Sequence, residues 1–200
     1  MNALPVMKPY IGGKWIDSES QKYTTIYDPS TGKPIAQVPQ CTAAEVEMAV
    51  AAAKAAFPAW KNTPVRTRAG IMMKLRNLIE RDKEELTRMV ATENGKCWNE
   101  AAGDVAKALE MTELACSAPS LLMGESLMDT SNGYDTTLYR EPIGVFAGIA
   151  PWNFPAMIPV GWMAPLAIVC GNAFVLKPAS TTPMTSMKFA ELYKEAGVPD

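Results

Sequence analysis

Histidine is absent from the 200-residue sequence. Without an imidazole, these residues cannot by themselves form a Ser-His-Asp or Cys-His nucleophile, a histidine-ligated zinc site or a histidine general base. Any chemistry that the chain carries must therefore come from cysteine, lysine, carboxylates, amides, the backbone or a bound cofactor.

Cysteine is scarce, and its spacing excludes two further kinds of site. The four cysteines, Cys41, Cys97, Cys116 and Cys170, form no Cys-x-x-Cys pair. In a chain that is 48% hydrophobic, scattered thiols are typical of a reduced cytoplasmic protein, not of a disulfide framework or a zinc site. We therefore predict no metal site and a cytoplasmic location.

A large excess of charge of either sign is also missing, since 19 basic residues face 21 acidic ones for a net charge of −2. This balance argues against a nucleic-acid partner held by phosphate contacts. The N-terminus has no charged segment followed by an apolar run, so we expect no signal peptide.

Charge is absent altogether from residues 142–176. A membrane span is one interpretation of so long an uncharged segment, but prolines and glycines interrupt it at short intervals. We favour a strand over 145–150, an apolar helix over about 155–169 and a second strand over 173–176. Such a β-α-β unit, with its elements buried on both sides, is typical of a parallel sheet and predicts an α/β fold.

The flanking sequence predicts turns and helices. Residues 8–40 carry short strand-like runs with turn chemistry at 11–14 and 28–32, and 136–139 is typical of an exposed strand. The expected helices begin at the capping box Thr42-x-x-Glu45, run from Thr63-Pro64 to Asn94-Gly95, from about Trp98 to Ala118 before Pro119, and from Thr182-Pro183 to Ala196-Gly197. Two parallel strands are fewer than a doubly wound domain needs, so we expect a fragment of a larger fold.

Two loops are candidates for chemistry, because ligands of open α/β sheets bind beyond the carboxyl ends of the strands. The first, at 150–155, contains Asn153 ahead of a helix, where its amide could cap that helix or stabilise an oxyanion. The second begins at Lys177, which suits a phosphate or a ribose but could equally be a solvated lysine. A Gly-x-Gly-x-x-Gly fingerprint is missing, so a standard Rossmann pyrophosphate turn is not supported.

The motifs Leu138-Tyr139-Arg140-Glu141-Pro142-Ile143-Gly144-Val145, Ala150-Pro151-Trp152-Asn153-Phe154-Pro155 and Lys177-Pro178 closely resemble the aldehyde dehydrogenase superfamily. Segments 10–15, 28–32 and 93–96 extend the resemblance over the chain in the correct order. Segments 148–151, 154–159 and 167–172 are most similar to methylmalonate/malonate-semialdehyde dehydrogenases, which use NAD and pass the acyl group to coenzyme A.

The resemblance implies a partial Rossmann-like domain and a cysteine-based oxidation. On this basis, residues 1–200 are the N-terminal part of an NAD(P)-binding domain, with an oligomerisation strand at about 134–141 and no catalytic domain. The expected assembly is a homodimer or homotetramer, and the substrate is an aldehyde. The nucleophilic cysteine and the general-base glutamate are expected beyond residue 200, so the chain alone should be inactive. The non-enzymatic alternative is a truncated nucleotide-binding module.

The resemblance also implies roles for individual residues. Asn153 matches the side-chain donor that stabilises the oxyanion, which favours catalysis over capping. The cofactor positions are Ile149, Ala150, Pro151, Trp152, Lys177, Ala179, Ser180 and Thr181.

Three departures from the family pattern affect specificity. Ser180 stands where NAD-preferring members usually have glutamate, which predicts use of NADP at least as good as that of NAD. Lys107 stands where the methylmalonate enzymes use arginine for a substrate carboxylate; its alternative is a solvated helix lysine paired with Asp104 or Glu110. Trp152 replaces the phenylalanine of the coenzyme A branch, which keeps open a hydrolytic, NADP-preferring aldehyde or succinate-semialdehyde dehydrogenase.

Overall fold

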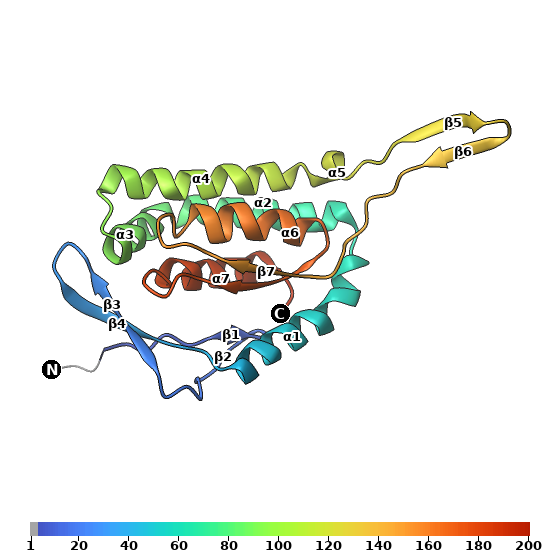
Figure 1. The fold of residues 1–200 in the computed structure, drawn as a ribbon. Helices are drawn as coiled ribbons and strands as arrows, with labels where there is room; N and C mark the ends of the chain where they lie inside the picture. Colours follow the sequence, from blue (N-terminus) through green and yellow to red (C-terminus); the bar gives the residue numbers. More distant parts are fainter. Residues whose placement is uncertain (1–3) are drawn as a thin grey trace.

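The computed structural model describes residues 4–200 and shows a mixed α/β arrangement in which a helical layer lies over a small parallel sheet (Figure 1). The helices are α1 (Ala43–Lys61), α2 (Val65–Arg81), α3 (Lys83–Asn94), α4 (Trp98–Cys116), α5 (Ala118–Leu121), η1 (Met157–Met163), α6 (Ala164–Val169) and α7 (Met184–Ala196). The strands are β1 (Tyr10–Ile11), β2 (Lys14–Trp15), β3 (Tyr23–Asp28), β4 (Lys33–Pro39), β5 (Ser126–Ser131), β6 (Tyr134–Thr137), β7 (Val145–Ile149) and β8 (Ala173–Lys177).

The core lies between helices α2, α3, α4, α6, η1 and α7. Its largest fully buried apolar side chains within this helical layer are Met72, Leu75, Ile79, Leu86, Val90, Val105, Val169, Phe189 and Leu192. The helical spacing of these residues explains the layer, because each helix presents one apolar stripe to its neighbours.

The predicted β-α-β unit is present. Strands β7 and β8 pair in parallel, in a register that sets Ile149 opposite Lys177. The intervening helix begins two residues later than expected, and its first part, η1, is a π-helix. Pro159 has no N–H to donate, and the Gly161 N–H donates to the Ala156 carbonyl 3.2 Å away, five residues back.

Burial of β7 on both sides is a prediction that the structure contradicts. Phe146, Ala147 and Ile149 are exposed. The reason is that β7 has one hydrogen-bonded neighbour, β8, within residues 4–200, so its other edge is open.

Two helix boundaries also differ from the predictions. The expected continuous helix up to Asn94-Gly95 breaks at Asp82, which separates α2 from α3 with a backbone φ of −98° and ψ of 13°. Helix α4 ends at Cys116, and Pro119 lies in the first turn of the separate helix α5, where its missing N–H is not needed.

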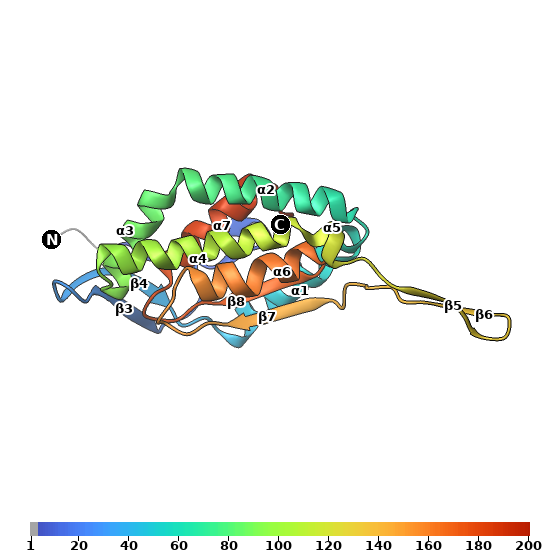
Figure 2. The same ribbon diagram turned by 90° about the horizontal axis from the view of Figure 1, so that it is seen from above.

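A hairpin of β5 and β6 extends away from the helical layer, with every strand residue exposed (Figure 2). Strand β6 begins two residues before the expected strand and ends at Thr137, so Leu138 and Tyr139 lie outside it. Its partner β5 was not predicted, because its sequence lacks the alternation of a half-buried strand.

The helices of the described residues include none that combines the length and the apolar character needed to cross a membrane. The uncharged segment 142–176 is instead divided between β7, η1, α6 and β8.

Candidate functional site

The two predicted loops start side by side at the carboxyl edge of the parallel sheet. The Ala150 N–H donates to the Lys177 carbonyl oxygen at 3.1 Å, directly beyond the last paired residues of β7 and β8. The loop that contains Asn153 and the loop that begins at Lys177 therefore leave adjacent strand ends, as the topology of a β-α-β unit requires.

Asn153 is exposed and does not cap the helix that follows it. Helix η1 begins at Met157 after the N-cap residue Ala156, which makes no side-chain cap. The Met157 N–H instead donates to Oδ1 of Asp104, a buried residue of α4, at 2.7 Å. The capping interpretation of Asn153 is therefore wrong, because another helix supplies that acceptor.

Neighbours from elsewhere in the chain hold the residues on either side of Asn153. Asn94 Nδ2 donates to the Trp152 carbonyl oxygen at 2.8 Å, and the Thr182 hydroxyl lies 3.5 Å from the same oxygen. The ammonium of Lys96 lies 3.9 Å from the centroid of the Phe154 ring.

The second loop places a cation and a hydroxyl together at the end of β8. Lys177 Nζ lies 3.3 Å from Ser180 Oγ, and both residues are exposed. Ile149, opposite Lys177 in the sheet, is 76% exposed, which is unusual for an isoleucine at the end of a strand.

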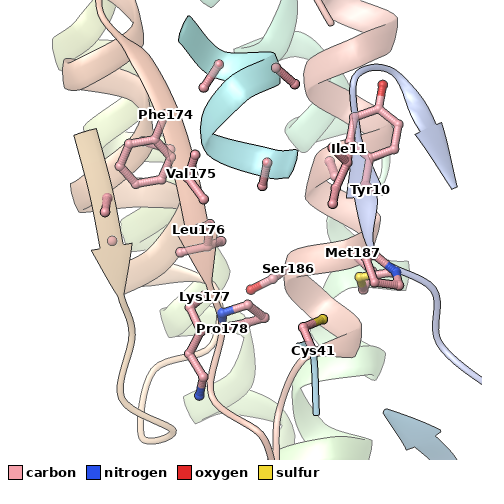
Figure 3. A pocket seen from close by; sticks show the side chains of 18 of the residues that line it. Tyr10, Ile11, Cys41, Phe174, Val175, Leu176, Lys177, Pro178, Ser186 and Met187 are labelled. Carbon is pink, nitrogen blue, oxygen red and sulfur yellow. The ribbon is translucent and has the colours of Figure 1, made fainter. Parts of the chain in front are cut away.

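A cavity of about 890 Å³ lies beside this edge, between α1, β8 and α7. Figure 3 shows Lys177 and Pro178 at the end of β8, with Ser186 and Met187 of α7 and Cys41 around the same space. Ser186 Oγ is buried and has no hydrogen-bond partner within residues 4–200. The cavity therefore offers an unpaired hydroxyl in largely apolar surroundings.

The cavity collects some of the predicted cofactor residues and not others. Ile149, Lys177, Ala179 and Ser180 line it. The remaining four predicted positions lie outside its lining: the buried Ala150 and the exposed Pro151, Trp152 and Thr181.

Lys107 lies on the exposed face of α4 and not in either loop. Its ammonium pairs with Glu110 Oε2 at 2.7 Å, one of the two partners considered for a solvated helix lysine. The other, Asp104, is buried and pairs with Lys96 at 2.9 Å. Lys107 lies one turn beyond Asp104 on α4. Asp104 accepts the N–H of Met157, the first residue of η1.

Two buried carboxylates lie at the starts of the two helices that follow the parallel strands. Asp104 bonds η1, and Glu93 at the end of α3 accepts the N–H groups of Met184 at 2.7 Å and Thr185 at 2.9 Å, the first residues of α7. Burial raises the pKa of Glu93 to about 7, although the three hydrogen bonds from Met184 and Thr185 act in the opposite direction. In each helix that follows a parallel strand, the first N–H groups therefore donate to a carboxylate of another helix, Asp104 of α4 for η1 and Glu93 of α3 for α7.

The sequence did not predict that Glu93, Asn94, Lys96 and Asp104 contact the two loops or the helices that follow them. The sequence feature that could have pointed to three of them is the segment 93–96, which carries part of the family resemblance. Their partners are 8 to 92 residues away along the chain, beyond the range of local patterns.

Three of the four thiols are poor candidates for a nucleophile. Burial raises the pKa of the Cys41, Cys116 and Cys170 thiols, which disfavours the reactive thiolate. Cys97 is exposed at the N-cap of α4 and makes no side-chain cap there.

Comparison with known proteins identifies the family. The model of the aldehyde dehydrogenase family matches residues 15–200, nearly the whole chain. The chain belongs to the aldehyde dehydrogenase family. This confirms the resemblance read from the motifs around Asn153 and Lys177.

Among aldehyde dehydrogenases, malonate-semialdehyde dehydrogenase 2 of Geobacillus kaustophilus is 50% identical over 194 residues, which cover 97% of this chain and 40% of that protein. The structure of a methylmalonate-semialdehyde dehydrogenase from Oceanimonas doudoroffii matches with a TM-score of 0.95 and 39% identity, over 98% of this chain and 40% of that one. A putative methylmalonate-semialdehyde dehydrogenase from Sinorhizobium meliloti, complexed with NAD, matches with a TM-score of 0.95 and 37% identity, over 100% of this chain and 40% of that one. The chain thus spans about 40% of the length of these aldehyde dehydrogenases.

The edge of the sheet fits a nicotinamide dinucleotide. The exposed apolar side chain of Ile149 can contact a flat ring, and the Lys177 ammonium and the Ser180 hydroxyl can bind ribose or phosphate oxygens. Because these groups are side chains, a glycine-rich pyrophosphate turn is not needed for such a contact.

Proposed function

We propose that this chain is the N-terminal part of the NAD(P)-binding domain of an enzyme that oxidises a small semialdehyde. In this proposal the acyl group forms a thioester with a cysteine and then passes to coenzyme A. The observation that carries the proposal is the exposed Asn153 at the same sheet edge as Lys177. The 50% identity to a malonate-semialdehyde dehydrogenase supports the substrate class.

Asn153 is the proposed catalytic residue of this chain. Its side-chain amide donates a hydrogen bond to the aldehyde oxygen as a thiolate adds to the carbonyl carbon, which stabilises the negative charge that develops there. The thiolate and the general base are proposed to lie outside residues 1–200, as the family resemblance implies. Burial raises the pKa of three of the four thiols within these residues, which disfavours their thiolate forms.

The cofactor is proposed to bind along the edge of the sheet. Ile149, Ala150, Pro151 and Trp152 follow β7 toward Asn153 and would contact the nicotinamide half. The groups after β8 would hold the ribose and its phosphate: Lys177, Ala179, Ser180 and Thr181. When bound, NAD(P) accepts the hydride that leaves the substrate.

Two observations favour a second candidate, a hydrolytic aldehyde or succinate-semialdehyde dehydrogenase that prefers NADP. Trp152 matches the hydrolytic branch of the family, and Ser180 leaves the Lys177 ammonium free of a neighbouring carboxylate at this position. In this candidate, water takes the place of coenzyme A as the acceptor of the acyl group.

The assembly and location are part of the proposal. The fully exposed hairpin of β5 and β6 projects from the helical layer and suits contact with a second copy of the protein, in a homodimer or homotetramer. A cytoplasmic location is proposed from the scattered thiols.

Product analysis of the full-length protein with and without coenzyme A tests the proposal. Acyl-coenzyme A is the expected product with malonate semialdehyde or its methyl derivative, whereas free acid under both conditions would favour the hydrolytic candidate. Residues 1–200 alone should give no NAD(P)H signal with any aldehyde. Nucleotide binding by the full-length protein without aldehyde oxidation would support the non-enzymatic module instead.

A further inference from the structure

The connection between α3 and α4 reaches both neighbours of Asn153. Asn94 donates to the carbonyl oxygen of Trp152 at 2.8 Å, directly before Asn153 in the chain. Lys96 places its ammonium 3.9 Å from the ring centroid of Phe154, directly after it. The hydrogen bond holds the peptide unit that precedes Asn153, and the cation–π contact holds the side chain of the residue that follows it.

The cation at Phe154 is itself held in place. Lys96 Nζ pairs with Asp104 Oδ2 at 2.9 Å, and the two side chains are only 14% and 0% exposed. The second oxygen of Asp104 accepts the Met157 N–H at 2.7 Å. One buried carboxylate therefore ties Lys96 to the first residue of the helix that ends the loop, and in this low-dielectric setting both contacts are stronger than they would be in water.

The middle of the loop, residues 151–154, has little burial to keep it in one conformation, whereas Ala150, Pro155 and Ala156 at its ends are buried. Trp152 is 63% exposed and Phe154 is 36% exposed, and residues 150–156 lie between β7 and η1 without regular structure. An oxyanion donor must be held within a fraction of an ångström to be effective. The connection after α3 supplies the constraint that burial does not.

We infer that Asn94 and Lys96 are positioning residues for Asn153: Asn94 holds the backbone before it and Lys96 holds the Phe154 ring after it, so that the Asn153 amide meets the developing oxyanion. This inference rests on the function proposed above. Neither residue touches the substrate; each acts through the loop.

A double-mutant cycle in the full-length enzyme tests the link through Asn153. Asn153→Ala should lower kcat/KM for the aldehyde by about 10²-fold, and Asn94→Ala alone by about 10-fold. In the Asn153→Ala background, Asn94→Ala should cost nothing further, because its effect runs through the lost amide. Equal losses in both backgrounds would overturn the inference.

The matched control for Asn94 is Asn62→Ala. Asn62 Nδ2 also donates to a backbone carbonyl, that of Pro58 at 2.9 Å, but on the exposed end of α1. Asn62→Ala should leave both kcat/KM for the aldehyde and KM for NAD(P) unchanged.

Two variants, one that removes the charge of Lys96 and one that keeps it, test the role of this residue. Lys96→Met should lower kcat/KM by about 10-fold or more and also destabilise the fold, because Asp104 remains buried without its partner. Lys96→Arg keeps the charge and should restore most of the activity. Lys188 of α7 lies in a cluster with Asp82 and Glu85 at the start of α3, and Lys188→Met is the control for a general loss of stability. A Lys96→Met enzyme that is less stable but equally active would show a structural role only.

Fluorine NMR gives a readout that does not require turnover. The chain contains five tryptophans, and in 5-fluorotryptophan-labelled full-length protein the Trp152 signal is assigned from its loss in Trp152→Phe. Asn94→Ala should shift or broaden that signal, and Asn62→Ala should not. An unmoved Trp152 signal would overturn the inference. If Asn153→Ala leaves aldehyde oxidation intact, the proposed catalytic role of Asn153 fails, while the NMR result still decides whether Asn94 holds the loop.

Discussion

Glu93 at the end of α3 caps α7, 92 residues further along the chain: its two carboxylate oxygens accept the N–H groups of Met184 and Thr185 at 2.7 and 2.9 Å, and the Thr185 hydroxyl also bonds to it. Helix α7 has no cap from its own N-cap residue, Pro183. The start of the helix after β8 therefore depends on a carboxylate that belongs to the helical layer.

The protonation of Glu93 predicts a pH-dependent stability. Its pKa in the folded protein is about 7, raised by burial from an ordinary value of 4.5. Between these values the folded state keeps a proton that the unfolded state has released, so the free energy of unfolding falls as pH rises from 5 to 8, by at most about 3 kcal/mol. Hydrogen exchange of the α7 amides over this pH range measures the effect locally.

The control for this prediction is Glu84, an exposed carboxylate on α3, the helix that also carries Glu93. Glu93→Gln removes the titrating group and should flatten the pH dependence between 5 and 8. Glu84→Gln, which disrupts an exposed pair with Arg88, should leave the slope as it is. A Glu93→Gln protein with an unchanged slope would show that another group is responsible.

Close packing of α4 against η1 predicts that Gly161 cannot gain a side chain. A Cβ at Gly161 would lie 2.7 Å from the Ala108 Cα, a backbone atom that cannot rotate away. Gly161→Ala should therefore lower stability by about 1–3 kcal/mol, measured by thermal or chemical unfolding. Gly103→Ala is the matched helical control, because nothing lies within 4 Å of the added Cβ. It should be neutral or stabilising by up to about 1 kcal/mol, and equal losses at both glycines would contradict this account.

A serine instead of a carboxylate at position 180 predicts that the full-length enzyme accepts NADP. Lys177 Nζ lies 3.3 Å from Ser180 Oγ, and a 2′-phosphate placed here would meet a cation and a hydroxyl without a carboxylate at position 180. The full-length enzyme should show a kcat/KM for NADP at least equal to that for NAD. Ser180→Glu should lower the NADP value by about 10-fold or more through charge repulsion, and spare NAD. Ser120→Glu, on the distant helix α5, serves as the control for added charge. An NADP value of the unmodified enzyme tenfold or more below the NAD value would end this proposal.

The exposed positive charge of Lys107 predicts that the full-length enzyme selects an anionic aldehyde over a neutral one. Its ammonium is exposed and, within residues 4–200, pairs only with the neighbouring Glu110 at 2.7 Å, so a substrate carboxylate could compete for it. Lys107→Ala should raise KM for an anionic semialdehyde by about 10-fold, the value of one charge-assisted hydrogen bond, and leave a neutral aldehyde nearly unaffected. Lys83→Ala removes an exposed lysine near Glu80 and is the matched control. Equal changes for both aldehydes would leave Lys107 as a solvated helix lysine.

Much of the local structure was predictable from residues close together in the chain. The capping box at the start of α1 forms as expected, with the Thr42 N–H donating to Glu45 Oε2 at 2.6 Å and the Glu45 N–H donating to Thr42 Oγ1 at 3.3 Å. Gly95 ends α3 in the left-handed conformation, at a φ of 79°, as the Asn94-Gly95 signal predicts. The parallel pairing of β7 and β8 followed from the length and apolar character of the segments around the intervening helix.

The arrangement around the candidate site was less predictable. The motif placed Asn153 in a loop at the end of a strand, but left open whether its amide capped the next helix. Asp104 decides that question, because it supplies the acceptor for Met157 and leaves Asn153 out of the helix. Asp104 itself looked like a candidate partner of Lys107 at helical spacing, whereas the fold buries it against Lys96.

The sequence by itself determined the family, most of the helices and turns, and the parallel β-α-β unit, because those depend on motifs, periodicity and caps within a few residues of one another. Only the tertiary structure decided which charges meet under the sheet. Glu93, Asp104 and Lys96 could each pair with several groups in an extended chain, and the packing of α3 and α4 against η1 and α7 selects the partners that each of them has. A buried charge must be paired wherever the core places it, so its partner is set by the packing and not by its position in the sequence.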